Sequence, residues 1–320
     1  MTMPANNKPI PKTVLIFGAA GRIGGPLASY LTQAAPSVHL RLVSRSEARV
    51  DALKSAYPTA DVVCADYFDP ASLNKAVQGM EGVFVLTPGG TSEAPAMTNL
   101  VHALKQADSL IHLIRQIGIQ PEANPHRIPQ SLREPRLSLP VQHPIAKKIL
   151  DDSGLPVTYL NCGATFMDNF IYFGLSKSLR NEHRLVWPER LIPWIDPREV
   201  GEVAGRLFLS DNHRHIGQLH TLNNGQDIMR FGEVAQLMSE VWGIPITHDS
   251  SKESFLSTYA HIGPRLEELW DFFQYEQDNE VVWARNDFVE RILGRKPKTV
   301  REWLIEHRAA IMGAPELAAS

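Results

Sequence analysis

The chain has few cysteines, no long apolar run and no excess of charge of either sign. Its two cysteines, Cys64 and Cys162, form neither a CxxC pair nor a disulfide framework, which excludes a disulfide-rich scaffold and fits a reducing compartment. No apolar stretch approaches the length needed to span a bilayer, and residues 1–12 lack the apolar segment of a secretion signal. The sequence therefore predicts a cytoplasmic protein without a membrane attachment.

The balance of charge argues against a nucleic-acid partner. The formal net charge is −3, the isoelectric point is about 6.5, and the basic residues are scattered among acidic ones, so we expect no direct nucleic-acid binding. Hydrophobic residues make up 43% of the chain and charged residues 21%, which are ordinary values for a folded globular protein. At 320 residues the chain suffices for one large domain or for a core domain with a smaller one.

Short apolar segments alternate with helical patterns from residue 13 onward, which is typical of βαβ units around a parallel sheet. The predicted strands cover residues 14–17, 40–43, 62–65, 82–86, 110–114 and 157–160. We therefore predict an α/β fold, with a Rossmann domain built on a doubly wound parallel sheet in residues 12–165. Residues 166–320 are expected to form a smaller, mostly helical substrate-binding part, while segments near 196–224 return to the Rossmann core.

The regular alternation lapses into a proline-rich stretch at residues 119–143. Irregular loops of this length are often lids or binding segments, but the sequence leaves a merely solvated excursion open. Farther along, residues 231–242 and 300–311 carry apolar residues at helical spacing and predict two helices.

Glycines at positions 18, 21 and 24 follow the first predicted strand and precede a helix expected to begin near Pro26. Glycine suits such a turn because the chain bends tightly and a dinucleotide pyrophosphate must approach the backbone, while the helix N-terminus attracts the anion. The position directly after a strand makes this signal specific. The residues predicted to bind the pyrophosphate are Gly18, Ala20, Gly21, Arg22, Ile23 and Gly24.

The end of the second predicted strand favours NADP(H) over NAD(H). Sites for NAD place an acidic residue there, on the ribose 2′-hydroxyl, whereas this chain has Ser44 and Arg45. An arginine can pair with a 2′-phosphate, and a serine can add a hydroxyl. The alternative is that Arg45 is an ordinary solvated cation. Asp66, after the third strand, lies where the short-chain dehydrogenase superfamily, which the glycine spacing resembles, has an aspartate next to the adenine. The alternative is that Asp66 caps a turn.

The GxxGxxG spacing resembles the extended and atypical branches of the short-chain dehydrogenase superfamily, and further motifs resemble the NmrA-like branch. These motifs lie, in chain order, at residues 83–88 (VFVLTP), 143–147 (HPIAK), 153–158 (SGLPVT), 166–170 (FMDNF), 195–201 (IDPREVG) and 293–299 (LGRKPKT), with Trp303 beyond them. Position 199 is Glu where the family usually has Asp.

The resemblance implies one of two functions. Some members of the family are NADPH-dependent reductases of quinones or aromatic compounds, and others bind the cofactor as redox-sensing regulators. We expect hydride transfer between nicotinamide and a small apolar carbonyl, quinone or aromatic compound. The alternative is a non-catalytic NADP(H)-binding sensor that acts through a protein partner. A homodimer is left open.

The residues expected near the nicotinamide depart from the usual Ser, Tyr and Lys of the superfamily. The family pattern implies that Thr87, Pro88 and Gln116 border this end of the cofactor. It puts His143 where the superfamily has its tyrosine, and it retains Lys147, whose ammonium can contact the ribose and favour negative charge on a substrate oxygen. Lys147 and His143 are therefore the predicted catalytic residues, with a surface lysine as the alternative for Lys147.

His143 itself has two readings that the sequence does not separate. Its ordinary pKa suits a proton donor. However, Pro144 is expected at the first position of a helix, which puts His143 at the N-cap, where the helix N-terminus and Lys147 favour a neutral ring.

Two further groups of residues carry weaker signals. The aromatic residues Phe166, Phe170, Tyr172 and Phe173 either line a substrate pocket or belong to the core. The histidines at positions 213, 215 and 220 are predicted to lie in a solvated loop, and we expect no metal site.

Overall fold

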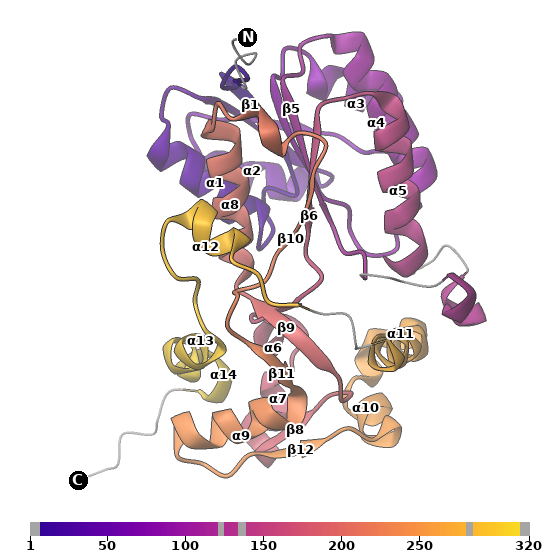
Figure 1. Cartoon of the computed structure of the whole chain (residues 1–320), viewed down its shortest axis with the longest axis vertical. Coiled ribbons are helices and arrows are strands. Elements are labelled where there is room, and N and C mark those ends of the chain that lie inside the picture. The colour runs from indigo at the N-terminus through magenta and orange to yellow at the C-terminus, as the bar shows by residue number, and fades with distance from the viewer. Residues whose placement is uncertain (1–6, 121–124, 134–138, 280–283, 314–320) are drawn as a thin grey trace, which may run out of the picture.

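The computed structural model describes residues 7–120, 125–133, 139–279 and 284–313. A seven-stranded parallel sheet forms the upper part of the molecule in Figure 1, in the order β10-β6-β5-β4-β1-β2-β3. Its strands are β1 (Thr13–Phe17), β2 (His39–Ser44), β3 (Asp61–Cys64), β4 (Gly82–Val85), β5 (His112–Ile117), β6 (Val157–Asn161) and β10 (Leu219–Thr221). The predicted Rossmann-type α/β fold is confirmed.

Helices cover both faces of this sheet, which is why its central strands read as continuous apolar runs. One face packs against α1 (Gly24–Ala34), α2 (Glu47–Ala56), α8 (Pro197–Leu209) and α12 (Phe288–Leu293), and the other against α3 (Pro70–Val77), α4 (Glu93–Ala107) and α5 (Leu139–Ser153). A Cβ atom on Gly201 of α8 would lie 2.6 Å from the backbone oxygen of Ile23. Glycine at this position lets α8 pack closely against the start of α1.

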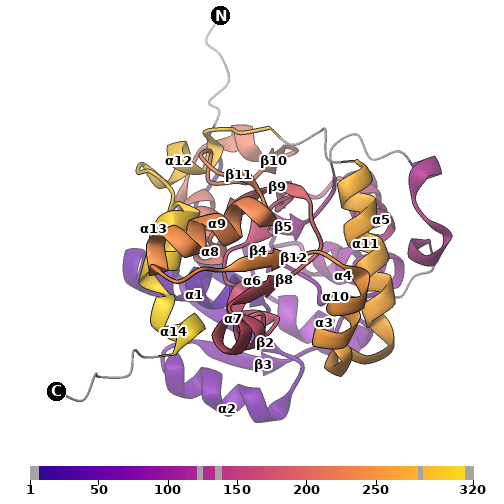
Figure 2. The ribbon, with the colours of Figure 1, turned by 90° about the horizontal axis from the view of Figure 1, so that it is seen from below.

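The lower part of the molecule has its own aromatic core and contains short strands that the expectation of a mostly helical part overlooked. Its two small sheets consist of β7 (Thr165–Phe166), β9 (Leu191–Ile195) and β11 (Ile228–Arg230), and of β8 (Arg184–Val186) and β12 (Thr247–Asp249). Its helices are α6 (Asn169–Tyr172), α7 (Ser176–Glu182), α9 (Phe231–Trp242), α10 (Lys252–Thr258), α11 (Leu266–Asp278), α13 (Val300–Glu306) and α14 (Arg308–Met312). Seen from below, α10 and α11 lie on one side, and α13 and α14 on the other (Figure 2).

The structure differs from the sequence prediction at three boundaries, and the first two lie at the site. Strand β5 continues to Ile117, so Arg115 and Gln116 belong to it. Helix α5 begins at Leu139, within the predicted loop, and Pro144 lies inside it. The predicted helix at 300–311 is interrupted at His307, whose ring stacks on Trp303 with centroids 4.1 Å apart.

His143 therefore lies inside α5 and not at an N-cap. A proline within a helix removes one backbone hydrogen bond. The turn before Pro144 is held instead by tertiary contacts, since Gln142 Oε1 accepts a 3.0 Å hydrogen bond from the Glu93 N–H and His143 is bonded to Gly118. Among the described residues, no helix combines the length and the apolar character needed to cross a lipid bilayer.

Candidate active site

The turn between β1 and α1 has the tight geometry that its glycines predict. Gly18 has a φ of +70°, and the Gly21 N–H donates a 2.9 Å hydrogen bond to the Gly18 carbonyl. A Cβ on Gly21 would lie 3.1 Å from that carbonyl oxygen, and one on Gly24 only 2.4 Å from it. Helix α1 begins at Gly24, two residues before the predicted start, and no side chain caps its first turn. Its backbone N–H groups are thus arranged as an anion site requires.

At the ends of β2 and β3, the side chains of Ser44 and Asp66 are hydrogen-bonded to nearby backbone, whereas Arg45 is exposed. The Ser44 hydroxyl donates to the Ser46 carbonyl at 3.0 Å and accepts from its N–H at 3.1 Å. Asp66 Oδ1 accepts a 2.9 Å hydrogen bond from the Phe68 N–H, as a turn-capping acid does. Arg45 is exposed at the end of β2. It is the charged group at the position where the sequence analysis expects a 2′-phosphate.

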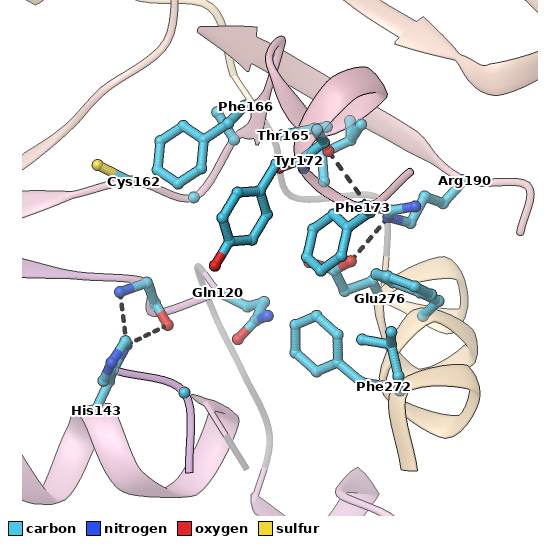
Figure 3. Close-up of a pocket in the computed structure, with 18 of the residues that line it drawn as sticks. Gln120, His143, Cys162, Thr165, Phe166, Tyr172, Phe173, Arg190, Phe272 and Glu276 are labelled. Atoms are coloured by element: carbon cyan, nitrogen blue, oxygen red, sulfur yellow. Dashed lines mark hydrogen bonds and ion pairs between the residues drawn. The ribbon is translucent and has the colours of Figure 1, made fainter. Parts of the chain in front are cut away.

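A cavity of about 670 Å³ lies beyond the carboxyl ends of β4, β5 and β6 and reaches across to α6 and α11 (Figure 3). Ligands of open α/β sheets bind at this edge, and the volume suits a small molecule. The predicted site residues that line it are Arg22, Thr87, Pro88, Gln116 and His143. The structure thus places side chains from distant parts of the sequence around one space.

The His143 side chain is held by the backbone at the end of β5. Its Nδ1 accepts a 2.7 Å hydrogen bond from the Gly118 N–H and lies 3.2 Å from the Gly118 carbonyl oxygen. Burial, with the Arg115 charge as a second cause, lowers the pKa of His143 to about 3. The ring is therefore neutral at physiological pH, and the cause is burial and Arg115, not the N-cap position and Lys147 that the sequence suggested.

A buried ion pair lies under the cavity floor, and sequence reasoning missed it. Arg115 Nη2 donates to Glu93 Oε1 at 2.8 Å and to Thr87 Oγ1 at 2.9 Å, and the Thr87 hydroxyl also donates to Glu93. Arg115 is completely buried. Its presence in an interior strand of the sheet is the signal that could have revealed the pair, because a buried charge needs a partner. The pair fixes the hydroxyl of Thr87.

Lys147 lies one turn beyond His143 on α5 and is not among the residues that line the cavity. Its ammonium is 2.5 Å from Asp151 Oδ2 and 4.8 Å from the centre of the Tyr159 ring. Its contact with a cofactor ribose remains a prediction.

Arg22 connects the glycine turn with the lower part of the molecule. Its Nη1 donates to Asp168 Oδ1 at 2.6 Å and to Asn169 Oδ1 at 2.7 Å. The guanidinium also lies over the rings of Phe166 and Tyr172, at 4.7 and 4.3 Å from their centroids. The turn and the start of α6 are therefore held together by a single side chain.

Aromatic side chains form much of the cavity wall. Phe166, Tyr172 and Phe173 line it, whereas Phe170 is buried in the core and stacks on Trp194, with centroids 5.5 Å apart. Helix α11 contributes Phe272 opposite these rings (Figure 3). The prediction of an aromatic pocket thus fits Phe166, Tyr172 and Phe173, and the alternative, a place in the core, fits Phe170.

A model of the NmrA-like family matches residues 11–304. The chain belongs to the NmrA-like family. A similar curated relative is a (4-alkanoyl-5-oxo-2,5-dihydrofuran-3-yl)methyl phosphate reductase of Streptomyces griseus, 24% identical over 95% of this chain and 100% of the relative. Similar solved structures include the Citrobacter sp. triphenylmethane reductase complexed with NADP(H), with a TM-score of 0.75, 19% identity and coverage of 92% of this chain and 99% of that one. Another is NmrA, a negative transcriptional regulator, in complex with NADP, with a TM-score of 0.71, 16% identity and coverage of 97% and 99%.

Two of the NmrA-like motifs are joined by the residue that departs from the family pattern. Glu199 Oε1 accepts a 2.6 Å hydrogen bond from Arg295 and a 3.1 Å bond from the Lys298 N–H. The Arg295 and Lys298 partners belong to the motif at residues 293–299. The glutamate thus anchors this C-terminal segment to α8, so its role here is structural.

Of the histidines after α8, His213 is exposed as expected, whereas His215 and His220 do not lie in a solvated loop. His215 is buried, its Nδ1 lies 3.1 Å from His220 Nε2, and the His220 ring stacks on Phe288 at 4.0 Å between centroids. The aromatic ring of α12, more than sixty residues away in the sequence, provides the burial. In the described ranges, no group of three or more His, Cys, Asp or Glu side chains is arranged to hold a metal ion.

Proposed function

We propose that the protein is an NADPH-dependent oxidoreductase that transfers a hydride between nicotinamide and a small apolar carbonyl, quinone or aromatic compound. The observation that carries this proposal is the cavity, which adjoins the glycine turn through Arg22 and has aromatic walls. The Streptomyces griseus relative is named a reductase, and the Citrobacter reductase was solved with NADP(H), which supports the same chemistry here.

The residues present fit NADP(H), because a side chain at Gly21 would crowd the turn and the first turn of α1 has no side-chain cap. We assign the pyrophosphate to the backbone from Gly18 to Gly24, and the 2′-phosphate to Arg45. Ser44 and Asp66 would shape the turns around the adenosine, using the local hydrogen bonds that they already make. Thr87, Pro88 and Gln116 would border the nicotinamide. The cofactor supplies the hydride when it is bound.

We assign His143 a positioning role. Its bond to the Gly118 N–H fixes the loop after β5, which borders the cavity beside Gln116. With a pKa of about 3, set by burial and by Arg115, the ring holds no second proton to donate at neutral pH.

We propose that Lys147 contacts the ribose next to the nicotinamide, as the His-x-x-x-Lys pattern of the family implies. It follows His143 by four residues and so lies on the same face of α5. Asp151 Oδ1 also accepts a 2.8 Å hydrogen bond from the Tyr159 hydroxyl, so the carboxylate keeps a partner if the ammonium turns toward the ribose.

These assignments give the upper and the lower part of the molecule different functions. Residues 12–165 would hold the cofactor, and residues 166–320 would provide most of the substrate contacts, while α8 and β10 belong spatially to the upper part. The described cysteines, Cys64 and Cys162, are both free, which supports the proposed cytoplasmic location.

The test is to mix the purified protein with NADPH and a panel of quinones, enones and aryl ketones, and to follow the absorbance of the reduced cofactor. We expect oxidation of NADPH that depends on both the protein and the acceptor. The competing function, an NADP(H)-binding regulator, needs no such turnover. Tight NADPH binding without oxidation by any acceptor in the panel would therefore favour the regulator.

A further inference from the structure

A second buried ion pair lies in the wall of the cavity. Arg190, just before β9, has its Nε 2.8 Å from Glu276 Oε2 on α11, and the two side chains are 4% and 9% exposed. The Arg190 guanidinium lies between the rings of Phe231 and Phe273, at 4.8 and 4.3 Å from their centroids. Figure 3 shows this pair and His143 on opposite sides of the cavity. It is therefore a polar group at the end of the cavity away from the proposed hydride-transfer site.

The hydrogen bonds of this pair are incomplete. Arg190 Nη2 donates to Thr165 Oγ1 at 3.3 Å, but among the described residues Nη1 has no hydrogen-bond partner. Glu276 Oε2 has no hydrogen-bond partner there apart from the ion pair with Arg190. The Gln120 side chain hydrogen-bonds to Glu276, but its Oε1 has no partner among the described residues. Arg190, Glu276, Gln120 and Thr165 all line the cavity. One donor, Arg190 Nη1, and one acceptor, Gln120 Oε1, are thus left without a partner at one place, and Glu276 Oε2 has only the ion pair.

Such an arrangement is costly for folding alone. A buried ion pair loses its hydration, and apolar side chains of similar volume often stabilise a core at least as well. Buried polar atoms without partners add a further cost, and in native proteins they call for an explanation. Ligand pockets that are mostly apolar commonly contain a few polar groups that orient the ligand.

The charges of the pair indicate what it would bind. Arg190 and Glu276 together carry no net charge, so a carboxylate or phosphate would gain from Arg190 but be repelled by Glu276. A hydroxyl group meets both requirements, because its oxygen accepts from Arg190 Nη1 while its proton is donated to Glu276 or Gln120. The aromatic rings of Phe173 and Phe272 favour a flat apolar body between the two ends.

We propose, on the basis of the function proposed above, that the substrate is a hydroxyl-bearing aromatic or conjugated ring compound. Its hydroxyl group binds at Arg190, Glu276 and Gln120, and its reducible group lies at the opposite end, beside Gln116. The pair thus determines specificity by accepting a neutral group that both donates and accepts a hydrogen bond.

The first test measures binding without turnover, so that it is independent of the oxidoreductase activity. The protein saturated with NADP⁺ is titrated calorimetrically with 2-naphthol, 2-methylnaphthalene and 2-naphthoate, which share a ring system and differ in one group. We expect 2-naphthol to bind about tenfold more tightly than either of the others. Equal affinity for 2-naphthol and 2-methylnaphthalene, or tighter binding of 2-naphthoate, would overturn the proposal. A protein that binds 2-naphthol selectively and oxidises no NADPH would instead contradict only the proposed activity.

The second test removes the pair in two ways. The double substitution Arg190→Met with Glu276→Leu removes both charges together and leaves neither one unpaired, and it should abolish the preference for 2-naphthol while thermal melting reports a folded protein. The single substitution Glu276→Gln keeps an amide in place of the carboxylate and removes the repulsion, so that 2-naphthoate should bind about tenfold more tightly than to the unmutated protein. If the double variant retains the preference, or if Glu276→Gln leaves the 2-naphthoate affinity unchanged, the pair does not select the ligand.

Discussion

The backbone N–H of Gly118 donates a 2.7 Å hydrogen bond to Nδ1 of His143, which joins the end of strand β5 to helix α5. The same Nδ1 lies 3.2 Å from the Gly118 carbonyl oxygen, so both backbone polar groups of Gly118 lie beside it. Burial, with the Arg115 charge as a second cause, outweighs the Gly118 bond and keeps this histidine neutral beside the cavity, with a pKa lowered to about 3.

The substitution His143→Gln should therefore leave most of the activity in place. Glutamine can still hydrogen-bond to the backbone, whereas loss of a general acid usually costs about 10² to 10⁴ in rate. We expect kcat to fall by less than about tenfold, a smaller loss than that range. Because the ring is protonated only as the pH falls toward about 3, the rate profile between neutral and mildly acidic pH should show no inflection from His143. A hundredfold loss, or an inflection that disappears in the variant, would restore the general-acid role.

Arg45 should decide between the two dinucleotides. Replacing it with Asp removes a charge-assisted contact to the 2′-phosphate, which should weaken the binding free energy of NADP⁺ by about 1.5 to 3 kcal/mol. The new carboxylate can accept a hydrogen bond from the free 2′-hydroxyl of NAD⁺. Calorimetry should show that the unmutated protein prefers NADP⁺ and that Arg45→Asp prefers NAD⁺. Arg49→Asp, at an exposed position of α2, is the matched control for the change in net charge and should preserve the preference. Equal affinities for both dinucleotides in the unmutated protein would refute the role of Arg45.

The glycine turn should tolerate a side chain at one position and not at another. A Cβ on Gly21 lies 3.1 Å from the Gly18 carbonyl oxygen, and Gly21→Val would extend into the space needed by the pyrophosphate. A Cβ on Gly25 lies at an ordinary 3.4 Å from Ala19. We expect Gly21→Val to fold but to lose dinucleotide binding, while Gly25→Ala retains it. Unchanged affinity in a folded Gly21→Val protein would mean that the turn is only structural.

Substitutions of Lys147 and of its partner Asp151 should have different effects on kcat and on NADPH affinity. Lys147→Met removes the ammonium, and we expect kcat to fall about 10²-fold, with a smaller loss of NADPH affinity, because the charge acts mainly in the transition state. Asp151→Asn leaves the ammonium in place and removes its carboxylate partner, so NADPH affinity should stay equal or rise. If both variants lose the same amount of activity and affinity, the pair serves only the helix surface.

The features that the sequence predicted are local ones. The alternation of apolar segments located the strands, and the spacing of Gly18, Gly21 and Gly24 located the turn, because both depend on residues close together in the chain. Helix α5 was predicted to start at Pro144 because proline favours the first turn, but contacts of Gln142 and His143 with distant residues extend the helix to Leu139.

The two buried ion pairs could not be predicted in this way. Glu93 and Arg115 lie on different elements, α4 and β5, and Arg190 and Glu276 are still farther apart in the chain. No spacing rule connects such partners. Only the three-dimensional fold shows that the Arg115–Glu93 pair hydrogen-bonds to Thr87 and that the Arg190–Glu276 pair lies in the cavity wall.

The central claim is that a hydride passes from the nicotinamide to a compound in the cavity. It is tested most directly with NADPH that carries deuterium at C4, in the pro-R or the pro-S position. The acceptor is an enone whose reduced product keeps its new carbon–deuterium bond in water. We expect the reduced product to contain deuterium from one labelled cofactor and not from the other, because the protein presents a single face of the ring. A product without deuterium from either cofactor, or an enone that stays unreduced while NADP⁺ binds tightly, would contradict the account.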